Sequence, residues 1–136
     1  MKVTILGTLP PITGISHYCL EQVNALSKFE DIQFINFKSI YPKLFYKWTI
    51  HEDLNPYDLP IRKNVKIFPV IKWYDPFSWI QAGLLIDGDI FHFHLWTFYL
   101  FPIIFTVTFI AKIRRKKIVC TVHNVSSHES NLFDVL

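Results

Sequence analysis

The sequence of 136 residues predicts an α/β fold in which helices flank a doubly wound, mainly parallel sheet. Two observations carry this prediction. Short apolar segments rich in β-branched residues alternate with longer segments in which apolar residues recur at helical spacing, as in successive βαβ units. The first 37 residues also contain a strand, a loop, a helix and a second strand in that order, which is the first unit of such a sheet. The length suits one domain over residues 1–136.

The expected strands are short and apolar: Lys2–Gly7, Ile32–Phe37, Val65–Phe68, Asp89–His94 and Ile118–Val122. The last of them follows a run of charges and consists mainly of β-branched residues, which predicts a strand buried on both faces. Helices are expected over Ile15–Lys28, from Pro76 to about Ile86, and from Phe98 or Phe101 to Lys116. Asp75 is the expected N-cap of the second helix, with Pro76 at its first position. Residues 38–63 are irregular and predict a long loop or short interfacial helices.

Composition and charge limit the class of protein. Hydrophobic residues make up 51% of the chain and aromatic residues 17%, so general disorder is excluded. The net charge of +3 is modest, but five positive charges fall within six positions, at Lys112, Arg114, Arg115, Lys116 and Lys117. Such a cluster suits nucleic acid, anionic lipid or water. The favoured interpretation is a solvated helix end whose cations complement the helix dipole, and nucleic acid is not an expected partner.

The cysteines and the apolar segments bear on the compartment of the protein. Cys19 lies in a helical pattern and Cys120 in a strand pattern, which predicts buried free thiols in a reducing, cytoplasmic environment. The apolar run at the N-terminus is too short for a signal peptide. Leu95–Ala111 holds 17 residues without a charge, the lower limit for a bilayer span, but Pro102 and three threonines interrupt it. We expect a buried or membrane-facing helix there, with a membrane-spanning helix as the alternative.

The turn after the first strand is a candidate site for a phosphate or a sugar. The segment Gly7–Gly14 lacks the glycine spacing of a dinucleotide-binding fingerprint, and no Lys-Ser or Lys-Thr pair follows it as in a P-loop. Gly14 nevertheless stands directly before the first helix, where backbone N–H groups and the helix dipole attract an anion. A glycine required only by the turn is the alternative, and the sequence leaves both open.

The segment Asp89–His94 brings two histidines onto one face of a strand. With a period of two, His92 and His94 share a face with Ile90, and phenylalanines occupy the other face. A His-x-His pair can bind a metal, but no carboxylate or further histidine follows at a supporting short spacing, so no metal site is expected. His92 is expected in the core, whereas His94, at the end of the strand, is a candidate for lining a cleft.

His123 is the strongest candidate for chemistry. It follows the fifth predicted strand, shares a face with Val119 and Thr121, and precedes a polar segment. In an open parallel sheet such a strand end lies where ligands bind. An imidazole there hydrogen-bonds a hydroxyl or a phosphate, or transfers a proton near neutral pH, and a purely structural role is the alternative.

Three segments in this order resemble the N-terminal domain of a GT-B glycosyltransferase of family 4, a group of mostly retaining enzymes that use nucleotide sugars. Pro10–Tyr18 is similar to the family's Pro-Pro…Gly-Ile-Ser-x-Tyr turn and helix. Asp89–His94 is similar to its "D-hydrophobic-h-H-x-H" strand. Thr121–Asn124 is similar to its "T-V-H-D/N" strand end. Their order and spacing cover nearly the whole chain. The resemblance implies a Rossmann-like domain that forms the acceptor-binding, N-terminal half of a GT-B architecture.

The resemblance also implies roles for individual residues. His123 is the implied catalytic residue, near the transferred sugar. The implied contacts with the acceptor or with the donor phosphates are Gly14, Ile15, His94 and Asn124. The nucleotide-sugar donor acts as a co-substrate, and no cofactor is expected.

The sequence departs from the family pattern in two ways. Thr13-Gly14 stands where many members have Gly-Gly, and no E-x7-E pattern of a donor-binding domain follows. The chain is therefore expected to be inactive without a C-terminal donor-binding domain or subunit, and to bind a sugar or a lipid-linked acceptor. A stand-alone Rossmann-like binding or regulatory subunit without catalytic activity is the alternative.

The resemblance further implies docking on a membrane through basic and aromatic side chains. The expected membrane-facing residues are Lys43, Lys47, Trp48, Arg114, Arg115 and Lys116. Aromatic rings and basic residues together suit an anionic membrane surface. We therefore expect a cytoplasmic protein that is peripheral at the inner face of the membrane.

Overall fold

The computed structural model describes residues 1–10, 15–40 and 61–123. Within these residues the strands are β1 (Lys2–Leu6), β2 (Asp31–Ser39), β3 (Val65–Lys72), β4 (Ile90–Leu95) and β5 (Lys117–Val122). The helices are α1 (Ser16–Leu26), α3 (Pro76–Leu85) and α4 (Phe101–Ile113), with a short 3-10 helix, η3 (Phe98–Leu100), directly before α4.

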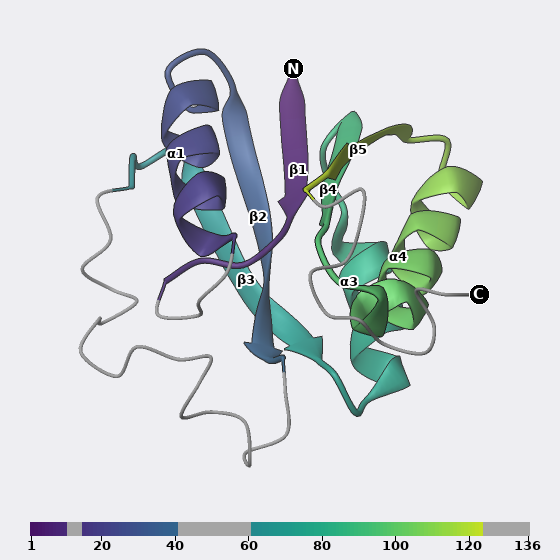
Figure 1. Cartoon of the computed structure of the whole chain (residues 1–136). Coiled ribbons are helices and arrows are strands. Elements are labelled where there is room, and N and C mark those ends of the chain that lie inside the picture. Colours follow the sequence, from purple (N-terminus) through teal and green to yellow (C-terminus); the bar gives the residue numbers. More distant parts are fainter. Residues whose placement is uncertain (11–14, 41–60, 124–136) are drawn as a thin grey trace.

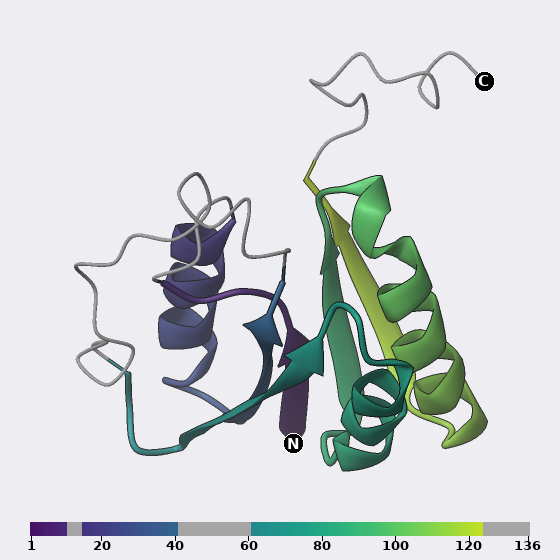
Figure 2. The same cartoon turned by 90° about the horizontal axis from the view of Figure 1, so that it is seen from below.

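These elements form a parallel sheet between two helical layers. Helix α1 covers one face of the sheet, and α3 and α4 cover the other (Figure 1); the turned view in Figure 2 separates the two layers. The strand order is β3-β2-β1-β4-β5, and all neighbouring strands are parallel. The predicted α/β class with a doubly wound parallel sheet is confirmed. Because the chain builds the sheet outward from β1 in both directions, the β1–β4 pair is the switch point near which such sheets bind ligands.

The alternation of side chains along the strands builds one hydrophobic core on each face of the sheet. Ile5 and Phe34 point toward α1 and pack with Val23 of that helix. Leu6 and Ile35, the next residue of each strand, belong to the core that α3 and α4 cover. The strands are therefore apolar on both faces, as expected of a parallel sheet that is covered on both sides.

A buried polar network fixes the turn that leads from α3 into β4. Oε1 of Gln33 accepts hydrogen bonds from the Thr4 hydroxyl at 2.7 Å and from the Asp87 N–H at 2.9 Å. Nε2 of Gln33 donates to the Leu85 carbonyl at 2.8 Å, and the Thr4 hydroxyl accepts from the Gly88 N–H at 2.9 Å. Since every partner is satisfied, the network holds the start of β4 against β1 without the cost of an unpaired buried polar group.

The boundaries of α3 and β3 agree in part with the sequence predictions. Oδ1 of Asp75 accepts a hydrogen bond from the Phe77 N–H at 3.1 Å, and Pro76 is the first helical residue, so the predicted N-cap is confirmed. β3 extends four residues beyond the predicted end at Phe68 and contains Pro69. A proline is tolerated there because β3 lies at the edge of the described sheet, where one side of the strand needs no ladder hydrogen bond.

Helix α4 ends at Ile113, before the predicted end at Lys116. Arg115 adopts a left-handed conformation with φ 59°. Its N–H donates to the Lys112 carbonyl, and the Lys116 N–H donates to the Ala111 carbonyl, each at 3.0 Å. This pattern is a Schellman motif, which closes a helix most often with glycine at the left-handed position. The run of basic residues therefore turns away from the helix instead of continuing it.

The prediction that the fifth strand is buried on both faces is wrong. Lys117, Val119, Cys120 and Val122 of β5 are exposed, because β5 lies at the edge of the described sheet and pairs there with β4 alone. The expectation of two buried thiols is consequently wrong for Cys120, whereas Cys19 is buried.

The long apolar segment forms η3 and α4, and α4 is buried on one side only. Ile103, Ile104, Val107 and Ala111 pack into the core, while the opposite side of the helix carries exposed phenylalanines. Among the helices that the structure describes, none combines the length and the apolar character that crossing a bilayer requires.

Candidate functional site

The structure brings His94 and His123 together at the carboxyl ends of β4 and β5. Nδ1 of His94 lies 2.9 Å from Nε2 of His123. The strand pairing explains this contact, because β4 and β5 place His94 beside Thr121, and the His123 N–H extends the ladder by donating to the Leu95 carbonyl at 2.9 Å. Two predicted site residues that lie 29 positions apart are therefore neighbours on the face that α1 covers.

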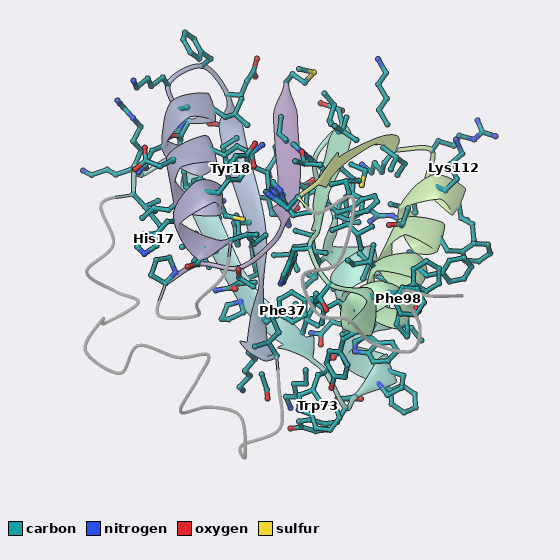
Figure 3. The ribbon with its side chains drawn as sticks, viewed as in Figure 1. His17, Tyr18, Phe37, Trp73, Phe98 and Lys112 are labelled. Carbon is teal, nitrogen blue, oxygen red and sulfur yellow. The ribbon has the colours of Figure 1, made fainter. Side chains whose placement is uncertain are left out.

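Helix α1 adds Tyr18 and Gln22 to this pair. The two residues are four positions apart and so share one side of the helix. The Tyr18 ring meets both imidazoles edge to face, with centroid distances of 5.6 Å to His94 and 4.8 Å to His123. Figure 3 shows Tyr18 on the sheet side of α1 and its neighbour His17 on the outer side. His94 is fully buried and Tyr18 is 49% exposed, so Tyr18 and the half-buried His123 form the outer layer of the cluster.

Four hydrogen bonds form a chain in which each residue donates to the next, from His123 to His94, then to Gln22, His92 and Thr121. Oε1 of Gln22 only accepts, so Nε2 of His94, 2.8 Å away, carries a proton. The unprotonated Nδ1 of neutral His94 then accepts from Nε2–H of His123. On the other side, the amide Nε2 of Gln22 donates to Nδ1 of His92 at 3.4 Å, and Nε2 of His92 donates to the Thr121 hydroxyl at 2.6 Å. In this orientation the amide of Gln22 fits one tautomer of each of the three histidines.

The tautomer of His123 decides what the cluster can do chemically. Because Nε2 of His123 donates to His94, the lone pair of neutral His123 is on Nδ1. Within the described residues, no group is hydrogen-bonded to this Nδ1. Among the imidazole nitrogens of the cluster, it is the one that the described residues leave able to accept a hydrogen bond or a proton from a ligand hydroxyl.

Burial and mutual repulsion favour the neutral form of these histidines. Burial, followed by the charges that His92 and His123 would carry, lowers the pKa of His94 from 6.5 to about 4. Burial also lowers the pKa of His92, with a smaller contribution from His123. The partial burial of His123 lowers its pKa in the same direction. His94 is thus neutral at neutral pH, which its role as hydrogen-bond acceptor requires.

Gly7, directly after β1, allows the backbone at the switch point to approach the cluster. A Cβ at this position would lie 2.8 Å from Sγ of Cys19 and 3.3 Å from Cδ2 of His94. Burial raises the pKa of the Cys19 thiol to about 11, although a hydrogen bond with the Thr8 backbone opposes this shift. Cys19 is therefore an inert packing residue beneath the site and not a nucleophile.

The described residues include four others that were predicted to contact a ligand or a membrane. Ile15 occupies the N-cap position of α1 and packs against the core on that face. Nη1 of Arg114 donates to the carbonyls at the end of α3, those of Gly83, Leu84 and Ile86, at 3.0, 3.0 and 2.7 Å. Arg115 is exposed in its left-handed turn, and Lys116 is partly exposed beside it.

The remaining predicted site residues lie outside the described part of the chain. They are Gly14, Lys43, Lys47, Trp48 and Asn124. Their predicted contacts with phosphate, sugar or lipid stay predictions.

The prediction of site residues missed Gln22 and Tyr18. A signal was present, because Gln22 is a polar residue within the sheet-facing pattern of α1 and follows Tyr18 by one helical turn. Within the described residues, no group of three or more His, Cys, Asp or Glu side chains has the geometry to hold a metal ion. Both ring nitrogens of His92 and His94, and Nε2 of His123, lie within hydrogen-bonding distance of Gln22, of Thr121 or of one another.

Comparison with protein-family models gives no match for this chain, and comparison with curated proteins gives none either. The relation to GT-B glycosyltransferases of family 4 therefore stays a prediction that rests on the three sequence segments. What the structure defines is the class: an α/β domain with a Rossmann-like parallel sheet and a histidine cluster at its carboxyl edge.

Proposed function

We propose that this chain is the acceptor-binding half of a retaining glycosyltransferase that transfers a sugar from a nucleotide-sugar donor to a lipid-linked or glycan acceptor. One observation carries the proposal: His123 directly follows β5, which pairs with β4 of the switch point, and His94 holds its ring with Nδ1 as the acceptor. This edge is where open α/β sheets bind their ligands. The three sequence segments that resemble family 4 support the choice of a sugar as that ligand.

In the proposed reaction, an acceptor hydroxyl forms a bond to the anomeric carbon of the donor sugar. The bond from that carbon to the nucleoside diphosphate breaks, the diphosphate leaves with the bonding electrons, and the proton of the acceptor hydroxyl passes to an oxygen of the leaving diphosphate. Nδ1 of His123 accepts a hydrogen bond from a sugar hydroxyl and so orients the sugar for attack. His94 and Gln22 are positioning residues, because they act through the ring of His123. The donor nucleotide is bound by a second domain or subunit.

A binding experiment tests this proposal without requiring turnover by the chain alone. Imidazole nitrogen and proton resonances are followed by NMR during titration with nucleotide sugars, free sugars, short polyprenyl phosphates and adenine dinucleotides. We expect a sugar-containing ligand to shift the Nδ1 resonance of His123. His123→Ala should weaken that binding by about tenfold or more, since it removes a directional hydrogen bond. His17→Ala, on the outer side of α1, is the matched control and should bind as the parent does.

The positioning roles have a separate readout. Gln22→Leu should weaken ligand binding and also change the tautomer populations of His94 and His123, which the nitrogen shifts report directly. Unchanged tautomers in this variant would contradict the directional network. Binding of adenine dinucleotides alone, or of none of the ligands, would contradict the sugar-transfer proposal; the first result would support a stand-alone binding or regulatory subunit.

A further inference from the structure

The outer side of α4 carries a row of stacked phenylalanines. Phe101, Phe105 and Phe109 recur every four residues and are 48%, 59% and 57% exposed. Their rings stack in succession, with centroids 6.0 Å and 6.2 Å apart, and Phe98 stacks on Phe101 at 5.7 Å. Ile113 is also exposed and continues the row by one turn. The outer side of α4 therefore carries an apolar row from its first turn to Ile113, with the exposed Lys112 beside it in the last turn.

Helix α3 widens this apolar surface. Phe77, Ile80 and Leu84 are exposed at a spacing that places them on one side of α3. The two helices pack side by side on the same face of the sheet (Figure 2). We call the exposed side chains of both helices the α3–α4 apolar face: Phe77, Ile80, Leu84, Phe101, Phe105, Phe109 and Ile113. Single exposed apolar residues are normal on a protein surface, but a contiguous apolar surface of this kind marks an interaction site.

One end of the α3–α4 apolar face is basic. The five cations of residues 112–117 begin in the last turn of α4 and continue beyond it. Figure 3 shows Phe98 and Lys112 toward opposite ends of α4. Neither α3 nor α4 contains an acidic residue, and residues 90–123 contain none. The nearest acids along the chain are Asp75, Asp87 and Asp89 at the ends of α3 and β4, and Asp87 is paired with Lys2.

We propose that the α3–α4 apolar face docks on an anionic lipid bilayer. The phenylalanine rings then lie at the boundary between headgroups and acyl chains, and the basic cluster lies among the anionic headgroups. Charge complementarity selects this occupant. A second copy of the chain, docked through the same face, would bring no acidic residue of α3 or α4 to the cations, whereas an anionic bilayer offers both an apolar layer and negative charge.

Arg115 adds an exposed cation at a backbone position that favours glycine. Its left-handed backbone, φ 59°, disfavours a side chain and suits glycine. A cation is nevertheless present at this position, and it is exposed at the basic end of the face. Glycine would suit this C′ position of the Schellman motif better, and the arginine instead adds an exposed cation to the basic end of the face.

Co-sedimentation of the full chain with vesicles tests this proposal. We expect binding to vesicles of phosphatidylcholine with phosphatidylglycerol, weaker binding to pure phosphatidylcholine, and a decrease with added salt. The double substitution Phe105→Asn with Phe109→Asn should lower the partition coefficient by at least about tenfold, because two rings lose their apolar contact. Phe29→Asn, which changes an 82% exposed phenylalanine in the turn after α1, is the matched control and should bind as the parent does.

Equal binding of the double variant and the parent would overturn the proposal, as would equal partitioning to neutral vesicles in high salt. Dimerisation in sedimentation velocity that the double variant abolishes, without vesicle binding by the parent, would assign the face to a second copy and would also overturn it. Circular dichroism establishes that the variants are folded. The proposal does not rest on sugar transfer, since vesicle binding is measured without nucleotide or sugar.

Discussion

His94 accepts a hydrogen bond from His123 across 2.9 Å, and it can do so only while its own Nδ1 is unprotonated. The contact therefore links the pKa of His94 to the tautomer of His123. The pKa of His94 is lowered to about 4 by burial and by its two histidine neighbours, and the resulting neutral ring fixes the tautomer of His123. A buried histidine thus determines which nitrogen its partially exposed neighbour presents to a ligand.

The first prediction concerns the stability of the fold in acid. In the unfolded chain His94 binds a proton as the pH falls below 6.5, whereas the folded chain resists protonation of His94 until about pH 4. The free energy of unfolding should therefore decrease as the pH is lowered from 6.5 to 4, with no further loss through this group below that value. At about 1.4 kcal/mol for each pH unit, the difference amounts to roughly 3 kcal/mol. Urea unfolding across this range measures it.

Substitution identifies the group responsible for this acid sensitivity. His94→Gln should remove most of the decrease, whereas His17→Gln, an exposed position on the same helix as Gln22, should keep it. The same pH dependence in the His94→Gln protein would show that other groups cause the loss of stability.

A second prediction concerns the buried network at Gln33. Gln33→Leu leaves the Asp87 N–H without its acceptor and removes one partner of the Thr4 hydroxyl. We expect the free energy of unfolding to fall by about 2 to 4 kcal/mol, because unpaired buried polar groups bear the full cost of desolvation. The control is Gln81→Leu, on the exposed side of α3, which should change stability little. A loss of equal size in both variants would contradict the assigned role.

A third prediction separates stability from docking at Arg115. Arg115→Gly relieves the left-handed conformation and should raise the free energy of unfolding by up to about 1 kcal/mol. The same substitution should weaken binding to anionic vesicles, since it removes a cation. Lys116→Gly removes a neighbouring cation whose φ is not in the left-handed region, so it should weaken binding without the gain in stability. Thermal unfolding and co-sedimentation of the two variants give both readouts.

The two thiols should differ in reactivity, which is the fourth prediction. Cys19 is buried and its pKa is raised to about 11 by that burial, whereas Cys120 is exposed on β5. A thiol reagent such as 5,5′-dithiobis(2-nitrobenzoate) should therefore modify Cys120 in the folded protein and reach Cys19 only after unfolding. Cys120→Ser should abolish the reaction of the folded chain. Rapid modification of Cys19 in that variant would contradict the packing described around Gly7.

The fold class could be predicted from the sequence because each strand is a short apolar run between helical segments. The period of two along β4 also separates His92 and His94 from Phe91 and Phe93, and the structure places the two pairs on opposite faces as predicted. The exposure of β5 could not be predicted in this way. Apolar, β-branched composition indicates a strand, but whether a strand is central or at an edge depends on pairing between segments distant in sequence.

The candidate site could likewise be predicted only in part from the sequence. His94 and His123 could be singled out because each ends a strand of a predicted parallel sheet, where side chains from neighbouring strands converge. The part played by Gln22 depends on the rotation of α1 over the sheet, which a helical pattern gives only coarsely. The direction of the hydrogen-bond chain depends on which atoms lie within about 3 Å of one another, and no sequence pattern contains that information.

Gly83 lies at the contact between α3 and α4, where a Cβ would come within 2.8 Å of Cβ of Ile110. Arg114 ties the end of α4 to the final carbonyls of α3. Helices α3 and α4 are therefore held against each other and present one continuous surface. In the proposed docking, the rings of both helices enter the headgroup layer over one broad area, whereas a single inserted helix enters it as a narrow wedge. Membrane curvature should then have little influence on the affinity of docking, so small and large vesicles of equal lipid area should bind the protein alike.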